Sequence, residues 1–246
     1  MEWKNKVFTT MSSFLLNLYY AKNKKKLYFV LPMEYDSEKE LLIANDFGFD
    51  YCRFRALELA AEEIYRNNIK GNVAEAGVAH GHFAKIINRV FPDRKLYLYD
   101  TFEGFSESDK RSELEKGYTS EEWFSSAKDY RLKGAEKNMK IVRSKMEHLD
   151  NCIFRKGYFP ESAVNETAEK FAFVSIDMDL YEPVFAALNF FYPRLAEGGV
   201  IFLHDYNHAE FKGIKVAVEN FEYNYGKINK FPLPDVGGTL VITKNN

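Results

Sequence analysis

The segment Phe171–Pro183 constrains the fold of this chain more than any other. Its first six residues, Phe-Ala-Phe-Val-Ser-Ile, form a largely apolar and β-branched run, which is typical of a strand buried on both faces of a parallel sheet. Two carboxylates, Asp177 and Asp179, follow at once. Glu182 and Pro183 then indicate the first turn of a helix. Because open α/β sheets bind ligands at the carboxyl ends of their strands, the two acids predict a binding site.

Strand and helix patterns alternate on both sides of this segment. The other expected strands are Asn72–Ala76, Lys95–Tyr99, about Cys152–Lys156, Val200–Leu203 and Gly238–Thr243. The expected helices are residues 38–69 ending at Gly71, Gly81 to about Val90, a region through Lys137, the segments after Pro160 and Pro183, and about Glu210 to Tyr223. Such alternation predicts a parallel sheet with helical crossovers, built as one domain over residues 36–246.

The helix before the first strand has an apolar stripe. Leu57, Ala61, Ile64 and Tyr65 are expected to share its buried face.

Two segments stand outside the alternation. Residues 1–35 form an N-terminal extension, in which Leu27–Leu31 has the composition of a short strand. The polar segment of residues 106–126 is longer than an ordinary strand-to-helix loop, so it predicts a lid or substrate-facing insertion.

Composition excludes several classes of protein. Hydrophobic residues make up 46% of the chain, too many for general disorder. The formal net charge of −2 gives no electrostatic case for nucleic acid or an anionic membrane. No apolar run reaches the roughly 18 residues of a membrane span. Two cysteines, Cys52 and Cys152, make no disulfide framework, which indicates a cytoplasmic protein. Phe14–Tyr20 is expected to form an amphipathic helix that packs on the domain or on a second subunit of a homo-oligomer.

The segment Glu75–Gly81 closes the first strand and opens a helix. Gly77 would allow a tight turn and close approach to a ligand, and Gly81 close packing at the helix start. Asp100 follows Gly77 by 23 residues, at the end of the next strand. A carboxylate there can accept hydrogen bonds from ribose hydroxyls, although an acidic helix cap is the plainer alternative. The combined pattern predicts a cofactor that contains adenosine.

The same turn indicates which cofactor. The chain lacks the first G-x-G pair of dinucleotide-binding motifs and has Glu75 two residues before the glycine. An anion so close to the turn would repel a pyrophosphate, whereas it suits a ligand with a cationic amino group. The sequence therefore predicts S-adenosylmethionine rather than NAD.

A second acidic group follows the strand Val200–Leu203, which ends in His204 and Asp205. Neighbouring strands lie about 4.8 Å apart, so these side chains and Asp177 can converge on one divalent cation. Oxygen ligands with water positions favour Mg²⁺, and an imidazole also tolerates Mn²⁺. Each residue alone would equally serve as a helix cap or ion-pair partner.

Five ordered motifs then carry a family resemblance. They are Gly71-Asn-Val-Ala-Glu-Ala-Gly-Val, Asp100-Thr-Phe-Glu-Gly-Phe, Gly157-Tyr-Phe-Pro, Ile176-Asp-Met-Asp-Leu-Tyr and His204-Asp-Tyr. Over about residues 50–243 the chain resembles the macrocin and mycinamicin (TylF-like) sugar O-methyltransferases. The resemblance implies a Rossmann-like class I methyltransferase fold with a mostly parallel seven-stranded sheet flanked by helices. It also implies S-adenosylmethionine, a divalent cation and a glycosidic small-molecule substrate.

The resemblance also assigns roles to residues. Asp177 matches a metal ligand and Asp179 the general base. His204 and Asp205 fall where the family usually has two aspartates, so His204 is a departure. The Ala79-His80 pair departs too, since the family tends to have Trp-Arg there. The candidate cofactor-binding residues are Glu75, Gly77, His80, Gly81, Asp100, Thr101, Phe102 and Asp177, and the candidate metal ligands are Asp177, His204 and Asp205.

Other functions stay open at this point. A similar acid-rich site would serve methylation of a catechol or another small phenol. A protein that binds S-adenosylmethionine without catalysis is an alternative of another class, and His204 in place of the usual aspartate would then reflect the lost activity. A nicotinamide oxidoreductase is a third alternative. Tyr118 and Trp123 in the insertion are expected either to stack on a sugar ring or to pack against the domain.

Overall fold

The computed structural model describes residues 50–126, 134–166 and 168–244. The N-terminal extension, the segment Leu27–Leu31 and the segment Phe14–Tyr20 lie outside the described residues. Among the helices that are described, none is long and apolar enough to cross a membrane.

The helices and strands of the described residues follow in chain order. They are α3 (Tyr51–Arg66), β1 (Asn72–Ala76), α4 (His82–Val90), β2 (Leu96–Asp100), α5 (Glu107–Glu115), α6 (Glu121–Ser126), α7 (Ala135–Lys145), η2 (Leu149–Asn151), β3 (Cys152–Lys156), η3 (Glu161–Glu166), β4 (Phe171–Ile176), α8 (Tyr181–Arg194), β5 (Leu195–Leu203), α9 (Lys212–Tyr225), β6 (Asn229–Pro232) and β7 (Leu240–Thr243).

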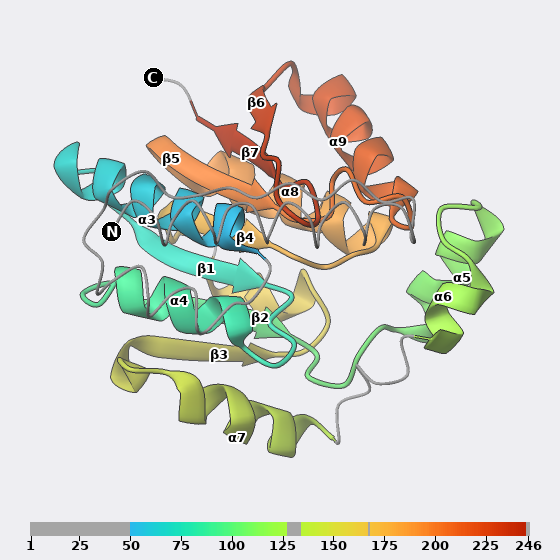
Figure 1. Cartoon of the computed structure of the whole chain (residues 1–246), viewed down its shortest axis with the longest axis horizontal. Coiled ribbons are helices and arrows are strands. Elements are labelled where there is room, and N and C mark those ends of the chain that lie inside the picture. The colour runs from blue at the N-terminus through green and yellow to red at the C-terminus, as the bar shows by residue number, and fades with distance from the viewer. Residues whose placement is uncertain (1–49, 127–133, 167, 245–246) are drawn as a thin grey trace, which may run out of the picture. The chain divides into compact units, whose positions relative to one another are not determined.

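The strands form one sheet in the order β3-β2-β1-β4-β5-β7-β6 (Figure 1). The pairs among β1 to β5 are parallel, whereas β7 runs antiparallel to both β5 and β6. This confirms the predicted seven-stranded, mostly parallel sheet flanked by helices. Strand β6 was not predicted from the sequence, because this edge strand is only Asn-Lys-Phe-Pro, mostly exposed and without apolar alternation.

Strand β4 lies at the centre of the sheet, between β1 and β5. All six of its residues are buried, as the apolar run predicted. One face of the sheet packs against α8 and α9, through side chains such as Leu188 and Val218. The other face packs against α3, α4 and α7, through Leu57, Ile86 and Val142. The central strand is thus shielded from water on both sides, and its carboxyl end opens at the edge of the sheet.

The helix before β1 differs in two details from the prediction. Leu57, Ala61 and Ile64 are buried, but Tyr65 is exposed. The helix ends at Arg66, five residues before Gly71. Gly71 instead allows β1 to begin close to β4, since a Cβ there would lie 2.8 Å from the backbone nitrogen of Ala172.

The predicted insertion contains two short helices, α5 and α6, rather than irregular chain. The next helix, α7, begins at Ala135, whereas the sequence predicted a helix running through Lys137. Gly134 precedes it with φ of 96°, a conformation that does not belong inside a helix. The predicted helix after Pro160 is a short 3₁₀ segment, η3.

Candidate functional site

The loops after β1, β2, β4 and β5 meet at the carboxyl edge of the sheet, and each has an unusual backbone. Each contains one non-glycine residue with positive φ: Ala79 (44°), Phe102 (56°), Asp179 (63°) and Asp205 (55°). Such a conformation costs on the order of 1–3 kcal/mol per residue and tends to cluster at functional sites. The backbone strain therefore marks the same edge as the predicted acidic residues.

Gly77 and Gly81 shape the turn between β1 and α4. Gly77 has φ of 89°, and a Cβ there would lie 1.9 Å from the backbone oxygen of Asp177. The close approach that demands a glycine is thus to the loop after β4, and contact with a ligand stays a prediction. Gly81 has φ of 72°, and a Cβ there would lie 2.9 Å from a methyl of Val142. Close packing at the start of α4 is thereby confirmed.

Asp100 ends β2 and holds this turn in place. Its Oδ2 accepts the N–H groups of Val78 at 2.7 Å and Ala79 at 2.8 Å. Its Oδ1 accepts the N–H of Phe102 at 2.6 Å. The two oxygens of a carboxyl side chain offer about four acceptor positions, so these three bonds leave room for a ribose hydroxyl. That contact stays a prediction.

Three further candidate residues flank the turn. The hydroxyl of Thr101 donates to the carbonyl of Gly104 at 2.9 Å. Phe102 is fully buried. The carbonyl of His80 accepts a hydrogen bond from Nζ of Lys145 at 2.7 Å. These contacts fix the loops around the turn. Cofactor binding by Thr101, Phe102 and His80 stays a prediction.

Glu75 is buried, with 1% of its surface exposed. Burial, and next the charge of Asp177, raises the pKa of Glu75 well above its usual range, while Arg53 acts in the opposite direction. Its Oε2 has no hydrogen-bond partner within the described part of the chain. Glu75 was expected from the sequence to be an anion. Its burial instead favours the neutral acid, which can donate as well as accept a hydrogen bond.

Asp177 lies between two cations. Arg53 Nη2 is 3.0 Å from Oδ2 of Asp177, and His204 Nδ1 is 3.0 Å from Oδ1. Burial alone would raise the pKa of Asp177, but His204 and then Arg53 outweigh it and hold the pKa well below the usual range. Asp177 is therefore ionised at neutral pH.

His204 brings the two strand ends together. Its Nδ1 lies 3.2 Å from Oδ2 of Asp205, in addition to its contact with Asp177. Burial alone would lower the pKa of His204, but the charge of Asp177 more than compensates and the pKa is raised to about 10. The three candidate metal ligands thus converge as predicted, with the imidazole of His204 between the side chains of Asp177 and Asp205.

Asp179 lies next to this group. Burial, and then the charges of Asp177 and Asp205, raises the pKa of Asp179 well above its usual range. Asp179 also shares a hydrogen bond with Asp205. In the protein alone, Asp179 is therefore favoured as the neutral acid beside the ionised Asp177, because adjacent negative charges cannot easily coexist.

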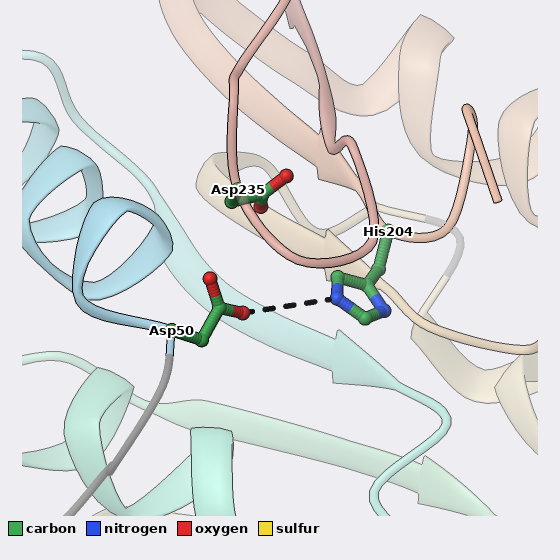
Figure 2. A group of neighbouring side chains, drawn as sticks. All are labelled: Asp50, His204 and Asp235. Carbon is green, nitrogen blue, oxygen red and sulfur yellow. Dashed lines mark ion pairs between the residues drawn. The ribbon is translucent and has the colours of Figure 1, made fainter. Parts of the chain in front are cut away.

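Sequence reasoning missed three residues of this site. Arg53 is buried, and its guanidinium lies 3.9 Å above the ring of Phe83. It falls on the apolar stripe of α3, one turn before Leu57, so a cation at a buried helical position was the available signal. Asp50 and Asp235 approach the far side of the His204 ring (Figure 2). They are distant in sequence and follow no motif.

Comparison with known proteins identifies the family. The family model of macrocin-O-methyltransferase (TylF) matches residues 49–242. The chain belongs to this family. It is 25% identical over 208 residues to the 8-demethyl-8-(2,3-dimethoxy-alpha-L-rhamnosyl)-tetracenomycin-C 4'-O-methyltransferase of Streptomyces olivaceus, covering 78% of this chain and 73% of that protein. It is 27% identical over 163 residues to the mycinamicin III 3''-O-methyltransferase of Micromonospora griseorubida, covering 63% of this chain and 62% of that protein.

A solved structure supports the fold. The structure of the O-methyltransferase NovP superimposes with a TM-score of 0.64 at 19% identity, covering 80% of this chain and 81% of that one. The TylF family places the chain among the S-adenosylmethionine-dependent O-methyltransferases.

The insertion of this methyltransferase packs against the domain. Tyr118 lies against Tyr181 at the start of α8, with ring centroids 5.8 Å apart. Trp123 lies edge-on to Phe211, just before α9, at 4.8 Å. Figure 1 shows α5 and α6 on the side toward which β1 points. Of the two expectations for Tyr118 and Trp123, the structure favours packing.

Proposed function

We propose that this methyltransferase transfers the methyl group of S-adenosylmethionine to a hydroxyl of a sugar carried by a small molecule. The family match over residues 49–242 carries the proposal. The names of the two relatives described above specify O-methylation, of a rhamnosyl-tetracenomycin in one case and of mycinamicin III in the other. The acidic carboxyl edge of the sheet lies where such a fold binds its ligands.

We propose further that a divalent cation assists the reaction. The donor atoms of Asp177, His204 and Asp205 all lie within 4.8 Å of one another. Two carboxylates and one imidazole suit Mg²⁺ or Mn²⁺. Arg53 binds only the second oxygen of Asp177, so Oδ1 can still serve as a ligand. The residues present therefore fit such an ion, which would orient the substrate hydroxyl and lower its pKa.

Asp179 is proposed as the base. The hydroxyl oxygen attacks the methyl carbon, the carbon–sulfur bond breaks, and the sulfonium becomes a neutral thioether. Burial and the neighbouring acids raise the pKa of Asp179 in the protein alone, and the positive charge of a bound cation would favour its ionised form. The hydroxyl proton then passes to this carboxylate. A carboxyl group with a raised pKa holds that proton more readily than an ordinary aspartate, which is what a general base near neutral pH requires.

The cofactor is proposed to lie over the turn between β1 and α4. Asp100 would accept from the ribose hydroxyls, and the backbone at Gly77 and His80 would approach the cofactor. The unpartnered oxygen of Glu75 supports a polar contact from the ligand side of the turn. Gly81, Thr101, Phe102 and Asp177 complete the proposed cofactor-binding set.

The test is incubation of the protein with methyl-labelled S-adenosylmethionine, Mg²⁺ and a panel of glycosides, followed by mass spectrometry. We expect label on a sugar oxygen, loss of transfer in EDTA and its return with Mg²⁺. Transfer to a catechol but to no glycoside would contradict the substrate class. Full activity in EDTA would contradict the cation.

A further inference from the structure

The far side of the His204 ring faces a second pair of acids. Nδ1 contacts Asp177 and Asp205, whereas Nε2 is buried and has no hydrogen-bond partner within the described residues. Oδ2 of Asp50 is the nearest charged oxygen on that side, 4.0 Å from Nε2 (Figure 2). Asp235 belongs to the same group, whose donor atoms lie within 4.8 Å of one another.

The fold directs Asp50 toward this ring. Asp50 precedes α3 at the N-cap position, where an aspartate usually accepts a hydrogen bond from the first turn, yet its side chain makes no such bond. Its Oδ1 instead accepts the N–H of Val236 at 3.4 Å. Its Oδ2 remains directed at His204. The side chain of Asp50 thus does not cap α3 and instead faces the imidazole of His204.

Asp50 and Asp235 differ in how many of their carboxylate oxygens already accept hydrogen bonds. The carboxylate of Asp235 accepts the N–H of Thr239 at 2.6 Å and also the hydroxyl of Thr239. Asp235 is therefore held by its own loop and contributes mainly negative charge. Asp50 is the acid with an oxygen available to Nε2.

Gly237 limits the space beside Nε2. A Cβ on Gly237 would lie 2.6 Å from Nε2 of His204 and 2.4 Å from Oδ1 of Asp205. A hydrated ion needs room for its water ligands, and the backbone of Gly237 occupies part of it. A hydrogen bond from Nε2–H needs no such room.

We propose that Asp50 is a positioning residue that fixes the tautomer and orientation of His204. Its carboxylate accepts a hydrogen bond from Nε2–H, so that Nδ1 presents its lone pair to the cation beside Asp177 and Asp205. A carboxylate on the second nitrogen of a metal-binding histidine raises the basicity of the first and usually changes metal affinity by about 10–100-fold. This inference rests on the cation in the proposed function.

The experiment is a Mn²⁺ titration followed by electron paramagnetic resonance, with no substrate present. It compares the wild-type protein, Asp50→Asn and a control, Asp150→Asn, which removes an exposed carboxylate of η2. We expect one ion per wild-type chain and about tenfold or greater weakening in Asp50→Asn. Asp150→Asn should bind as the wild type does, and S-adenosylmethionine affinity should be equal in all three.

A second readout reports the tautomer directly. Nitrogen-15 NMR of histidine-labelled protein, loaded with Mg²⁺ and with His204 assigned through His204→Gln, should show the proton on Nε2. At the same Mg²⁺ concentration, Asp50→Asn should show part of the His204 signal as the imidazolium, with a proton on both nitrogens, because less of the protein holds the ion. Unfolding would instead give a mixture of the two neutral tautomers above about pH 7, so the two outcomes are distinguishable.

Each contrary outcome has a distinct meaning. If the wild-type protein binds no Mn²⁺, the cation of the proposed function is overturned, and this inference with it. If the wild type binds one ion and Asp50→Asn binds it equally well, only the role of Asp50 fails. Two ions per chain, with the second lost in Asp50→Asn, would make Asp50 a direct ligand and also overturn the inference.

Discussion

Single residues at the carboxyl edge of the sheet decide how closely its loops approach. Gly77 has almost the same φ as Gly104, 89° against 92°, but their surroundings differ. A Cβ on Gly77 would meet the backbone of Asp177, whereas a Cβ on Gly104 would meet nothing within 4 Å. The pair therefore separates the cost of a left-handed backbone from the cost of a clash.

We expect Gly104→Ala to lower the free energy of unfolding by about 1 kcal/mol, the usual cost of positive φ. Gly77→Ala should lower it by about 3 kcal/mol or more, because the loop bearing Asp177 must also move. Urea denaturation of the two variants measures both. Equal losses would show that the approach to Asp177 is not tight.

The second prediction at the residue scale concerns Asp179. Asp179→Asn keeps the size of the side chain but cannot take up the hydroxyl proton. We expect turnover to fall by about 10²-fold or more with S-adenosylmethionine affinity nearly unchanged. Steady-state kinetics and calorimetry measure the two quantities, with Asp150→Asn as the control. Unchanged turnover would remove Asp179 from the role of base.

At the scale of elements, helix α5 is joined to α8 by one buried acid. Oε1 of Glu113 accepts the N–H of Tyr181, the first residue of α8, at 2.6 Å. The N-cap residue Leu180 has no side chain that could do so. Glu113 thus caps a helix that is remote in sequence and fastens the insertion to the domain.

We expect Glu113→Ala to lower the free energy of unfolding by about 1–2 kcal/mol, because the N–H of Tyr181 loses its partner. Glu115→Ala on the exposed side of α5 should change it by less than about 0.5 kcal/mol. Thermal unfolding measures the difference. Proteolysis should also cut residues 107–126 faster in Glu113→Ala alone. Equal behaviour of the two variants would mean that α5 is held by its aromatic contacts.

At the scale of the whole molecule, one histidine links the site to the stability of the fold. The pKa of His204 is about 10 in the folded chain against an ordinary 6.5. The folded state therefore binds the proton more tightly than the unfolded state. This contribution is fully present below about pH 6.5 and is lost as pH rises toward 10.

In EDTA, the free energy of unfolding of the wild-type protein should thus fall between pH 6.5 and pH 10. His204→Gln lacks this titration. The free energy of unfolding of the wild type minus that of His204→Gln should therefore decrease as pH rises. Denaturant titrations at several pH values measure the difference. A constant difference over that range would show that His204 titrates near its ordinary value.

The sequence alone determined the layout of this protein. Buried strands such as Phe171–Ile176 have largely apolar sequences, because a strand covered on both faces disfavours polar side chains. Acids placed directly after such strands, Asp100, Asp177 and Asp205, could therefore be assigned to one edge. The missed strand β6 shows the limit, since an exposed edge strand carries no such pattern.

Only the tertiary structure decided what surrounds those acids. Arg53 beside Asp177, and Asp50 and Asp235 beside His204, come from segments that are far apart in the chain. Arg53 helps to hold the pKa of Asp177 low, and a pKa depends on burial and distance in space rather than on position in the sequence. The sequence thus determined where the candidate ligands gather, and the packing of α3 against the strand ends decided the charge of Asp177.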